Sequence, residues 1–351
     1  MIFYLCILGI VLITCSSIWM DMNIKSNAKT VSINNDNRFW IAILLMIFIA
    51  SIRYGIGYDY YRYVARVEAF NSINYIYNYE YISRFIFFVA NKLKNPQLVF
   101  VIYSIIIYGC IGKAIADYSI DKNEAVIIYF CIFYIESLST IRQAAAVSVI
   151  LLGYKYIKDK KLIKYMLVCI IATLIHQFAF FAIAIYFVYY ISTTVNIVVS
   201  IVAFILSNYM LNYLAPKFYI FRLLSVYLKR TDQSGKIWLV LYTLIFIYVF
   251  FILILIKRKN NLIDKEIKRL LNVVFIGTIC PYVLGTGNGH RIGEYFLIFH
   301  ILLLALCNNK LNKSMKYAFN IMIIIVYIGY LYTTIRNGQY YIPYVSIWNV
   351  K

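Results

Sequence analysis

Residues 39–63 read FWIAILLMIFIASIRYGIGYDYYRY, an apolar run that passes directly into a polar, tyrosine-rich segment. The apolar part, residues 39–52, is typical of a helix in a lipid bilayer. Arg53 and Asp59 follow at the point where such a helix reaches water, together with two glycines. Ionisable groups are costly there and usually functional, so we interpret residues 53–63 as one wall of an active site.

The composition of the whole chain also indicates a membrane protein. Of 351 residues, 63% are hydrophobic and 14% are charged, whereas soluble domains carry about 25% charged residues. Apolar stretches recur from end to end without a long polar interval. The first, residues 2–17, lacks a basic start and is interpreted as a retained span, not a signal peptide. We predict an all-α polytopic helical bundle, residues 1–351 forming one domain in the cell membrane.

The net charge of +20 does not indicate a nucleic-acid partner, because the basic residues lie mostly in short loops and form no basic helix with interleaved aromatics. The seven cysteines all fall within apolar runs, and none forms a Cys-x-x-Cys pair. They are interpreted as helix-packing residues. No spacing of histidine, cysteine and carboxylate residues suggests a metal site, and no cofactor is predicted.

The basic loops predict the orientation in the membrane. Residues 155–164, 257–269 and 310–316 are rich in lysine and arginine, and such loops face the cytoplasm. About twelve spans are expected from the apolar runs, approximately at 2–19, 39–53, 97–113, 123–138, 140–157, 162–176, 178–191, 196–214, 237–256, 269–284, 291–307 and 316–335. Alternating these spans places both termini outside and the loop with Lys25, Lys29 and Arg38 inside.

This orientation gathers ionisable residues at the outer face, as a site open to that side requires. They are Arg53, Asp59, Glu136, Arg142, His176, His290, Arg291 and Glu294. Residues 81–93 are expected to form an amphipathic helix at the outer interface. The outer segment 215–236 is basic against the positive-inside rule, which suggests an anionic ligand. Residues 341–344, Tyr-Ile-Pro-Tyr, are expected to close over the site from outside.

In the opening segment, Arg53 is a candidate substrate contact, and Asp59 is a candidate general base or substrate-positioning group. The glycines allow a tight turn beside the substrate. Tyr60 and Tyr63 offer flat faces on which sugars stack. The structural alternative is an interfacial aromatic belt with snorkelling arginines, although a carboxylate such as Asp59 has no place in a belt.

Three further segments contain candidate site residues. Residues 140–146, Thr-Ile-Arg-Gln-Ala-Ala-Ala, open a span with Arg142 and Gln143 before small residues that allow close approach of a helix or a lipid-linked ligand. The alternative is that Arg142 pairs with Glu136. His176 ends a short span near the outer face. Residues 285–295 are glycine-rich but lack the features of a phosphate-binding P-loop, and read as a flexible outer loop leading into a helix that starts near Arg291.

The pattern Arg53-x-x-x-Gly57-x-Asp59-Tyr60-x-x-Tyr63 resembles the signature of the EpsG family, Wzy-like polymerases that join lipid-linked sugar repeat units into capsular or exopolysaccharide. The Arg142-Gln143 pair followed by alanines, His176, and an arginine near the start of the helix at Arg291 are also similar to that family. The chain departs from the family pattern at Phe178, where a small hydroxyl residue is usual.

The resemblance implies that the chain transfers a growing glycan from an undecaprenyl diphosphate carrier to a sugar hydroxyl of another lipid-linked repeat unit. Asp59 or His176 would be the base, and Arg53, Arg142 and Arg291 the cations that hold the diphosphate. The implied partners are the undecaprenyl diphosphate-linked oligosaccharide, membrane lipids, a flippase and a chain-length regulator. No nucleotide sugar is required.

Two other functions stay open at this stage. A flippase for lipid-linked oligosaccharide would place charges along a central cavity and often shows two similar halves, which this sequence lacks. A membrane O-acyltransferase would need catalytic groups that receive an acyl group from the cytoplasmic side. The outer clustering of polar residues favours the polymerase.

Overall fold

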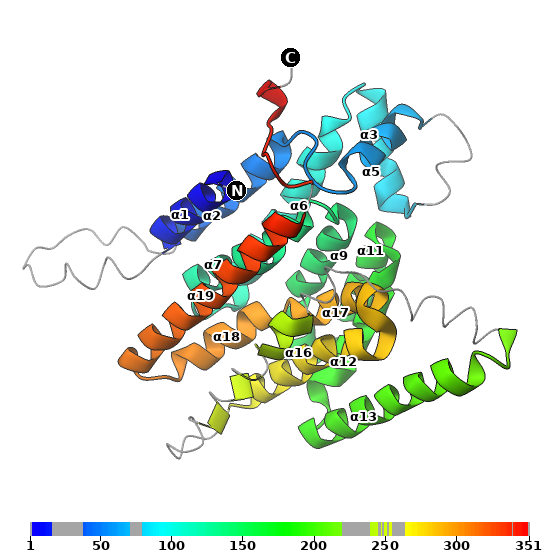
Figure 1. Ribbon diagram of the computed structural model, residues 1–351, viewed down its shortest axis with the longest axis vertical. Helices are drawn as coiled ribbons and strands as arrows, with labels where there is room; N and C mark the ends of the chain where they lie inside the picture. Colours follow the sequence, from blue (N-terminus) through cyan, green and yellow to red (C-terminus); the bar gives the residue numbers. More distant parts are fainter. Residues whose placement is uncertain are drawn as a thin grey trace, which may run out of the picture. The chain divides into compact units, whose positions relative to one another are not determined.

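The computed structural model of the chain describes residues 2–15, 38–70, 79–219, 264–338 and 340–349, with short pieces between 239 and 254 (Figure 1). The described residues form helices and turns, and their one β pairing is an isolated antiparallel bridge between Arg53 and Ser346. The predicted all-α class is confirmed. The loop with Lys25 and Lys29, and residues 220–236 of the basic outer segment, lie outside the described residues.

The described residues contain helices long and apolar enough to cross a membrane. Four reach this length: Gln97–Tyr118, Thr193–Leu214, Lys265–Leu297 and Ser314–Arg336. Shorter apolar helices occupy Ile2–Cys15, Phe39–Ile52, Leu162–Ile175, Gln177–Tyr190 and His300–Asn309. Together they are consistent with a multi-pass membrane protein.

Contacts group the chain into two compact units. The first comprises Met1–Leu152, Leu174–His176 and Lys313–Lys351, and the second comprises Gly153–Thr173 and Gln177–Asn312. Each unit is described by itself below. The candidate residues Arg53, Asp59, Arg142 and His176 belong to the first unit, and Arg291 belongs to the second.

The first unit is a helical bundle with a smaller helical layer at one end. Its bundle helices are α1 (Ile2–Cys15), α2 (Arg38–Ile52), α6 (Gln97–Tyr118), α7 (Lys122–Tyr129), the π-helical turn η2 (Phe130–Tyr134), α8 (Ile135–Ser137), α9 (Ile141–Leu152) and α19 (Lys313–Asn337). The smaller layer is formed by α3 (Tyr60–Glu68) and α5 (Tyr81–Lys92). The expected helix at 81–93 is therefore present.

Small residues allow the bundle helices to approach closely. A Cβ atom on Gly112 of α6 would lie 2.8 Å from the Trp40 ring of α2, so a larger residue would push the two helices apart. On its other side α6 packs against α9, where Ala145 and Ala146 are fully buried. The alanine run therefore serves helix packing in this structure.

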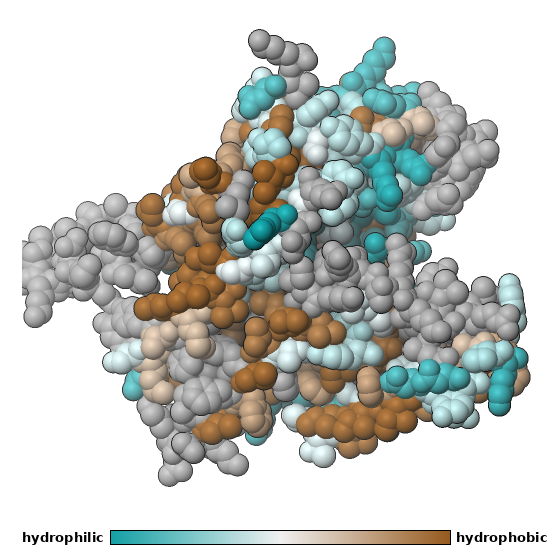
Figure 2. Space-filling view, viewed as in Figure 1, coloured by the Kyte–Doolittle hydropathy of each residue, from teal (hydrophilic) through white to brown (hydrophobic). Residues whose placement is uncertain are grey.

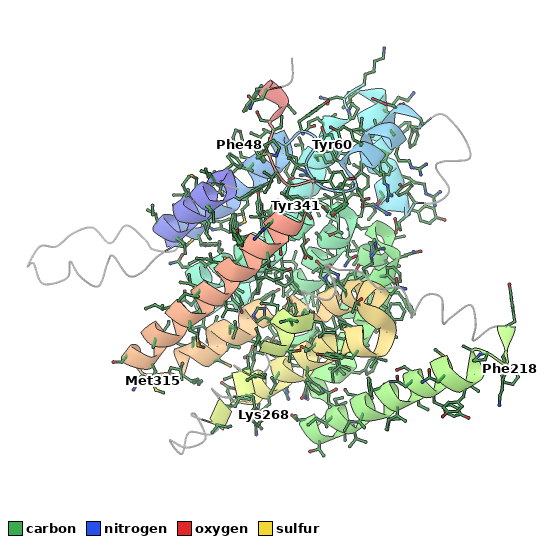
Figure 3. All side chains as sticks on the ribbon, in the orientation of Figure 1. Phe48, Tyr60, Phe218, Lys268, Met315 and Tyr341 are labelled. Atoms are coloured by element: carbon green, nitrogen blue, oxygen red, sulfur yellow. The ribbon has the colours of Figure 1, made fainter. Side chains whose placement is uncertain are left out.

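Hydrogen bonds show that α6 runs antiparallel to α2 and parallel to α9. At one end, the side chain of Gln97 at the start of α6 donates to the carbonyl of Ser51, 2.6 Å away at the end of α2. At the other end, the Tyr118 hydroxyl donates to the Leu152 carbonyl, which joins the last turns of α6 and α9. We call the end that contains Gln97 the motif end. In Figure 3, Tyr60 and Tyr341 label this end.

The second unit is built around the long helix α16 (Lys265–Leu284). Packed with it are α12 (Ile183–Tyr190), α13 (Thr193–Tyr209), the π-helical turn η5 (Gly285–Gly289), α17 (His290–Leu297) and α18 (His300–Asn309). The unit also contains α10 (Tyr154–Lys158), most of α11 (Leu162–Ile175), the 3₁₀ turn η3 (Gln177–Ala182) and the π-helical turn η4 (Met210–Leu214). Gly277 and Gly293 allow α16 and α17 to touch backbone to backbone.

The basic loops of the second unit meet at one end of it. Lys158 forms a 2.8 Å ion pair with Glu266, and Lys310 lies 3.8 Å from Asp264. These pairs join residues of all three loops that the charge rule assigns to one side of the membrane. Their common location agrees with that assignment, and the cytoplasmic orientation itself stays a prediction.

Apolar side chains are widely exposed on the bundle surface. Figure 2 shows brown, hydrophobic surface over α1 and α2 and along α13, and teal surface around α3. The exposed large apolar residues include Ile41, Leu44 and Phe48 on α2, and Ile201, Val202, Phe204, Ile205 and Leu206 on α13. A soluble protein would bury such faces, so they fit contact with lipid.

Candidate functional site

The segment 53–59 forms a tight loop whose glycines are required by its backbone. Gly55 and Gly57 have φ angles of +66° and +99°, which L side chains rarely adopt. A Cβ atom on Gly57 would also lie 2.4 Å from the Leu138 carbonyl oxygen. The expected turn is confirmed, and Gly57 brings the loop directly onto the turn between α8 and α9.

Arg53 turns inward from this loop and is 1% exposed. Its guanidinium donates to the carbonyl oxygens of Ala50 and of Leu138, the latter at 3.2 Å, and lies 4.8 Å from the centre of the Phe100 ring. Carbonyl oxygens and an aromatic face stabilise a buried cation. Arg53 thus ties the end of α2 to the α8–α9 turn, and its expected contact with a diphosphate stays a prediction.

Asp59 lies at the surface of the motif end. It is the residue before α3, and its carboxylate is 3.2 Å from the guanidinium of Arg62. The side chains of Asp59 and Arg62 are 31% and 80% exposed. A carboxylate in this position is accessible to a substrate, and its exposed partner does not shield it from one.

The tyrosines of the motif divide into buried and exposed groups. Tyr60 is buried, stacks on Phe100 at 4.3 Å and donates its hydroxyl to the Gln97 side chain at 3.0 Å. Tyr63 is also buried. Burial raises the pKa of each phenol to about 12, so both keep their protons at neutral pH. Tyr58 and Tyr61 are more than half exposed.

Arg142 lies in the first turn of α9 and points toward α3 and α5. One terminal nitrogen, Nη1, forms an ion pair with Glu80, Nε approaches the Tyr63 hydroxyl at 3.4 Å, and the guanidinium lies 4.5 Å from the centre of the Tyr79 ring. The partner of Arg142 is therefore Glu80 and not Glu136, whose carboxylate accepts a hydrogen bond from Tyr330 of α19 at 2.8 Å. The turn at residues 138–140 separates Glu136 from α9. The neighbouring candidate Gln143 is buried at the same helix start.

More arginines surround Tyr79 than the sequence patterns suggested. The Arg84 guanidinium donates to the Tyr79 carbonyl at 2.6 Å, and Arg66 lies 5.4 Å from the centre of the Tyr79 ring. The motifs missed Glu80, Arg66 and Arg84, because these residues match no family pattern. The sequence offers one signal for these residues, which is their position in or beside the short helices α3 and α5 next to the motif.

The C-terminal residues 340–349 pack onto the motif loop, and the expectation that residues 341–344 close over a site from outside stays a prediction. The amides of Tyr54 and Gly57 donate to the carbonyls of Val345 and Tyr340 at 2.8 and 3.0 Å. The Tyr341 hydroxyl is 2.7 Å from Ser139 Oγ, which also accepts from the Tyr58 amide. Burial raises the pKa of Tyr341, so its phenol stays protonated. We call residues 340–349 the C-terminal strap.

His176 and Arg291 are distant from the motif loop in the sequence. His176 follows α11 and is 8% exposed, and the preceding carbonyl, of Ile175, accepts a 3.0 Å hydrogen bond from Ser83 of α5. Arg291 is half-buried in the first turn of α17. The glycine-rich segment before it, expected to be a flexible loop, forms the π-helical turn η5. A Cβ atom on Gly289 would meet the Cys280 carbonyl at 2.3 Å, so this glycine lets η5 pack on α16.

The described residues contain no group of three histidine, cysteine, aspartate or glutamate side chains that could hold a metal ion. At the motif end the first unit presents the accessible carboxylate of Asp59, the exposed side chains of Tyr58 and Tyr61, and several guanidinium groups. Such a surface can accept a proton from a hydroxyl and bind an anionic group.

A family model described as the EpsG family matches residues 38–346. This range includes every candidate residue described above. No curated protein and no solved structure matches the chain significantly.

Proposed function

The chain belongs to the EpsG family, which is associated with exopolysaccharide biosynthesis, and from this premise we propose that it is a polysaccharide repeat-unit polymerase. It transfers a growing glycan from an undecaprenyl diphosphate carrier to a sugar hydroxyl of a second lipid-linked repeat unit. The observation that supports this most is the motif end of the first unit, where the accessible carboxylate of Asp59 lies on the same small layer as the Arg142 cluster.

The reaction is a displacement at the anomeric carbon. A bond forms between that carbon and the acceptor oxygen, and the bond to the lipid diphosphate breaks, so the diphosphate leaves with the electron pair. Asp59 takes the proton of the acceptor hydroxyl, and His176 is the second candidate for this role. Arg142 stabilises the charge that develops on the diphosphate, and Arg291 is the candidate cation of the second unit.

Other motif residues are proposed to shape the site. Arg53 and Tyr60 hold the loop in place, because both are buried and donate hydrogen bonds to the Leu138 carbonyl and the Gln97 side chain, respectively. Tyr63 and Gln143 support Arg142 at the start of α9. The exposed rings of Tyr58 and Tyr61 are the faces on which sugars of the acceptor stack. In this proposal the chain has about twelve spans and the motif end faces outside.

The experiment that tests this function replaces the carboxylate of Asp59 with an amide. Asp59→Asn keeps the shape of the side chain but is far less basic, so the polymerisation rate should fall by about a hundredfold or more, as for other losses of a general base. The assay uses purified protein and lipid-linked repeat units extracted from producing cells that lack it, and measures polymer length over time.

Asp117→Asn is the matched control, because Asp117 also sits in an exposed ion pair, 2.9 Å from Lys113, but at the opposite end of α6. It should polymerise at the wild-type rate. If Asp59→Asn also does so, Asp59 has no part in the chemistry. If the wild-type protein translocates lipid-linked oligosaccharide across vesicles without lengthening it, the protein is a flippase.

A further inference from the structure

Glu80 is the acidic group closest to the proposed diphosphate-binding arginine. Its carboxylate oxygen Oε2 bonds to Nη1 of Arg142, from a position 62 residues earlier in the chain. The side chain of Glu80 is 14% exposed and that of Arg142 is 21% exposed. A pair this far removed from water interacts more strongly than an exposed one, and losing either partner leaves a poorly solvated charge.

Two other contacts hold the same guanidinium. The Tyr79 ring lies against it, and the Tyr63 hydroxyl lies near Nε. Glu80 and Tyr79 thus approach Arg142 from the two residues that precede α5, and Tyr63 approaches it from α3. The described residues give the second terminal nitrogen, Nη2, no hydrogen-bond partner, so this donor remains for a ligand oxygen.

Glu80 differs from Asp59 in its surroundings. The partner of Glu80, Arg142, is mostly buried, whereas the partner of Asp59, Arg62, extends into solvent. Glu80 is therefore placed to hold a cation in one orientation.

We propose that Glu80 is a positioning residue that fixes the guanidinium plane of Arg142, so that Nη2 faces the oxygens of the lipid diphosphate. This inference rests on the proposed function, because it gives Arg142 the diphosphate as its ligand. A planar guanidinium binds such oxygens well only in the correct orientation, and preorganised donors stabilise a transition state more than mobile ones. Glu80 acts through Arg142 and touches no reacting atom.

A double-mutant cycle tests this role. Arg142→Ala should lower kcat by about a hundredfold, the usual loss for one preorganised donor. Glu80→Ala should lower kcat by at least about tenfold, with a smaller change in KM, because the cation stays but loses its orientation. The double variant should be no slower than Arg142→Ala within about twofold, because coupled residues are not additive.

Conservative variants separate positioning from general stability. Glu80→Gln keeps an oxygen that accepts a hydrogen bond but loses the charge, so kcat should fall only several-fold. Glu68→Ala is the matched control, since Glu68 is an exposed glutamate on α3. All kcat values are divided by the folded fraction, determined from size-exclusion profiles and thermal unfolding. Glu68→Ala should then equal the wild type.

Each result decides between the alternatives. Wild-type kcat in Glu80→Ala overturns the inference, as does a double variant in which the two losses multiply. Where Glu80→Ala fails to fold, Glu80→Gln carries the test alone, and a wild-type kcat there also overturns it. If Arg142→Ala polymerises normally, Arg142 has no place in the proposed mechanism. If instead Arg142→Ala has a low kcat and Glu80→Ala has the wild-type kcat, the proposed role of Arg142 stands and only the positioning role of Glu80 is overturned.

Discussion

Gly57 determines where the motif loop lies. Its φ of +99° and its contact with the Leu138 carbonyl leave no room for a Cβ atom, while its amide donates to the Tyr340 carbonyl. One missing side chain therefore lets three separate segments meet: the loop, the α8–α9 turn and the C-terminal strap. Asp59, two residues later, depends on this meeting point for its position.

Gly57→Ala should lower both stability and activity. The strained backbone alone costs on the order of 1–3 kcal/mol, and the clash with Leu138 adds to it. We expect a lower midpoint of thermal unfolding in detergent and a strong loss of polymerisation. Gly109→Ala is the control, because the helical Gly109 has nothing within 4 Å of its Cβ position. Equal unfolding midpoints for the two variants would contradict this account of the loop.

Local patterns predicted some residue positions and missed others. The turn glycines and the exposed carboxylate follow from types and spacing within ten residues. The Arg53 side chain points inward because it donates to the Leu138 carbonyl, 85 residues away in the chain. Arg142 pairs with Glu80, 62 residues away. No local pattern contains such pairings, so the motif could name these arginines but not their partners.

At the scale of the helices, apolar runs located most elements and misplaced several boundaries. The run at 97–113 predicts a span that ends at Lys113, yet α6 continues to Tyr118 because Lys113 pairs with Asp117 one turn later. An i, i+4 ion pair of this kind stabilises the helix. The helix therefore continues past charged residues that, in the sequence, suggest its end. The run at 140–157 is divided at Gly153 into α9 and α10. Hydropathy does not report either effect.

The C-terminal strap should stabilise the motif loop measurably. Tyr341→Phe removes the hydroxyl that bonds to Ser139 and leaves that buried group with one partner fewer, at a cost of about 1–3 kcal/mol. We expect a lower unfolding midpoint and faster proteolysis of the strap. Tyr332→Phe, at a partly exposed position on α19, is the control. A strap equally resistant to protease in both variants would show that the hydroxyl contributes nothing.

At the scale of the whole molecule, the sequence predicts that the three basic loops lie on one side of the membrane. The three basic loops chosen from lysine and arginine content are joined by ion pairs, in the second unit, between Lys158 and Glu266 and between Lys310 and Asp264. In the first unit Lys316 pairs with Asp121 at 3.1 Å, at the end opposite the motif loop. Lysine and arginine content predicts which loops share a side of the membrane, because the positive-inside rule applies to each short loop separately.

Thiol labelling tests the orientation. In a background with the seven native cysteines replaced by alanine, Lys92→Cys at the end of α5 should react with a membrane-impermeant reagent on intact cells. Lys160→Cys, in the loop after α10, should react only after the cells are permeabilised. Both positions are exposed. The reverse pattern would place the motif end, and every residue proposed for the chemistry, in the cytoplasm.

The strap also affects when during synthesis the motif end can form. The Tyr344 hydroxyl bonds to the Ile49 carbonyl at 2.7 Å, although 295 residues separate them in the chain. At about 5–20 residues per second, the ribosome needs roughly 15–60 s to make that interval. The loop with Asp59 is thus synthesised long before the segment that holds it. Under the proposed function, we expect a nascent chain that still lacks the strap to be inactive on lipid-linked sugars.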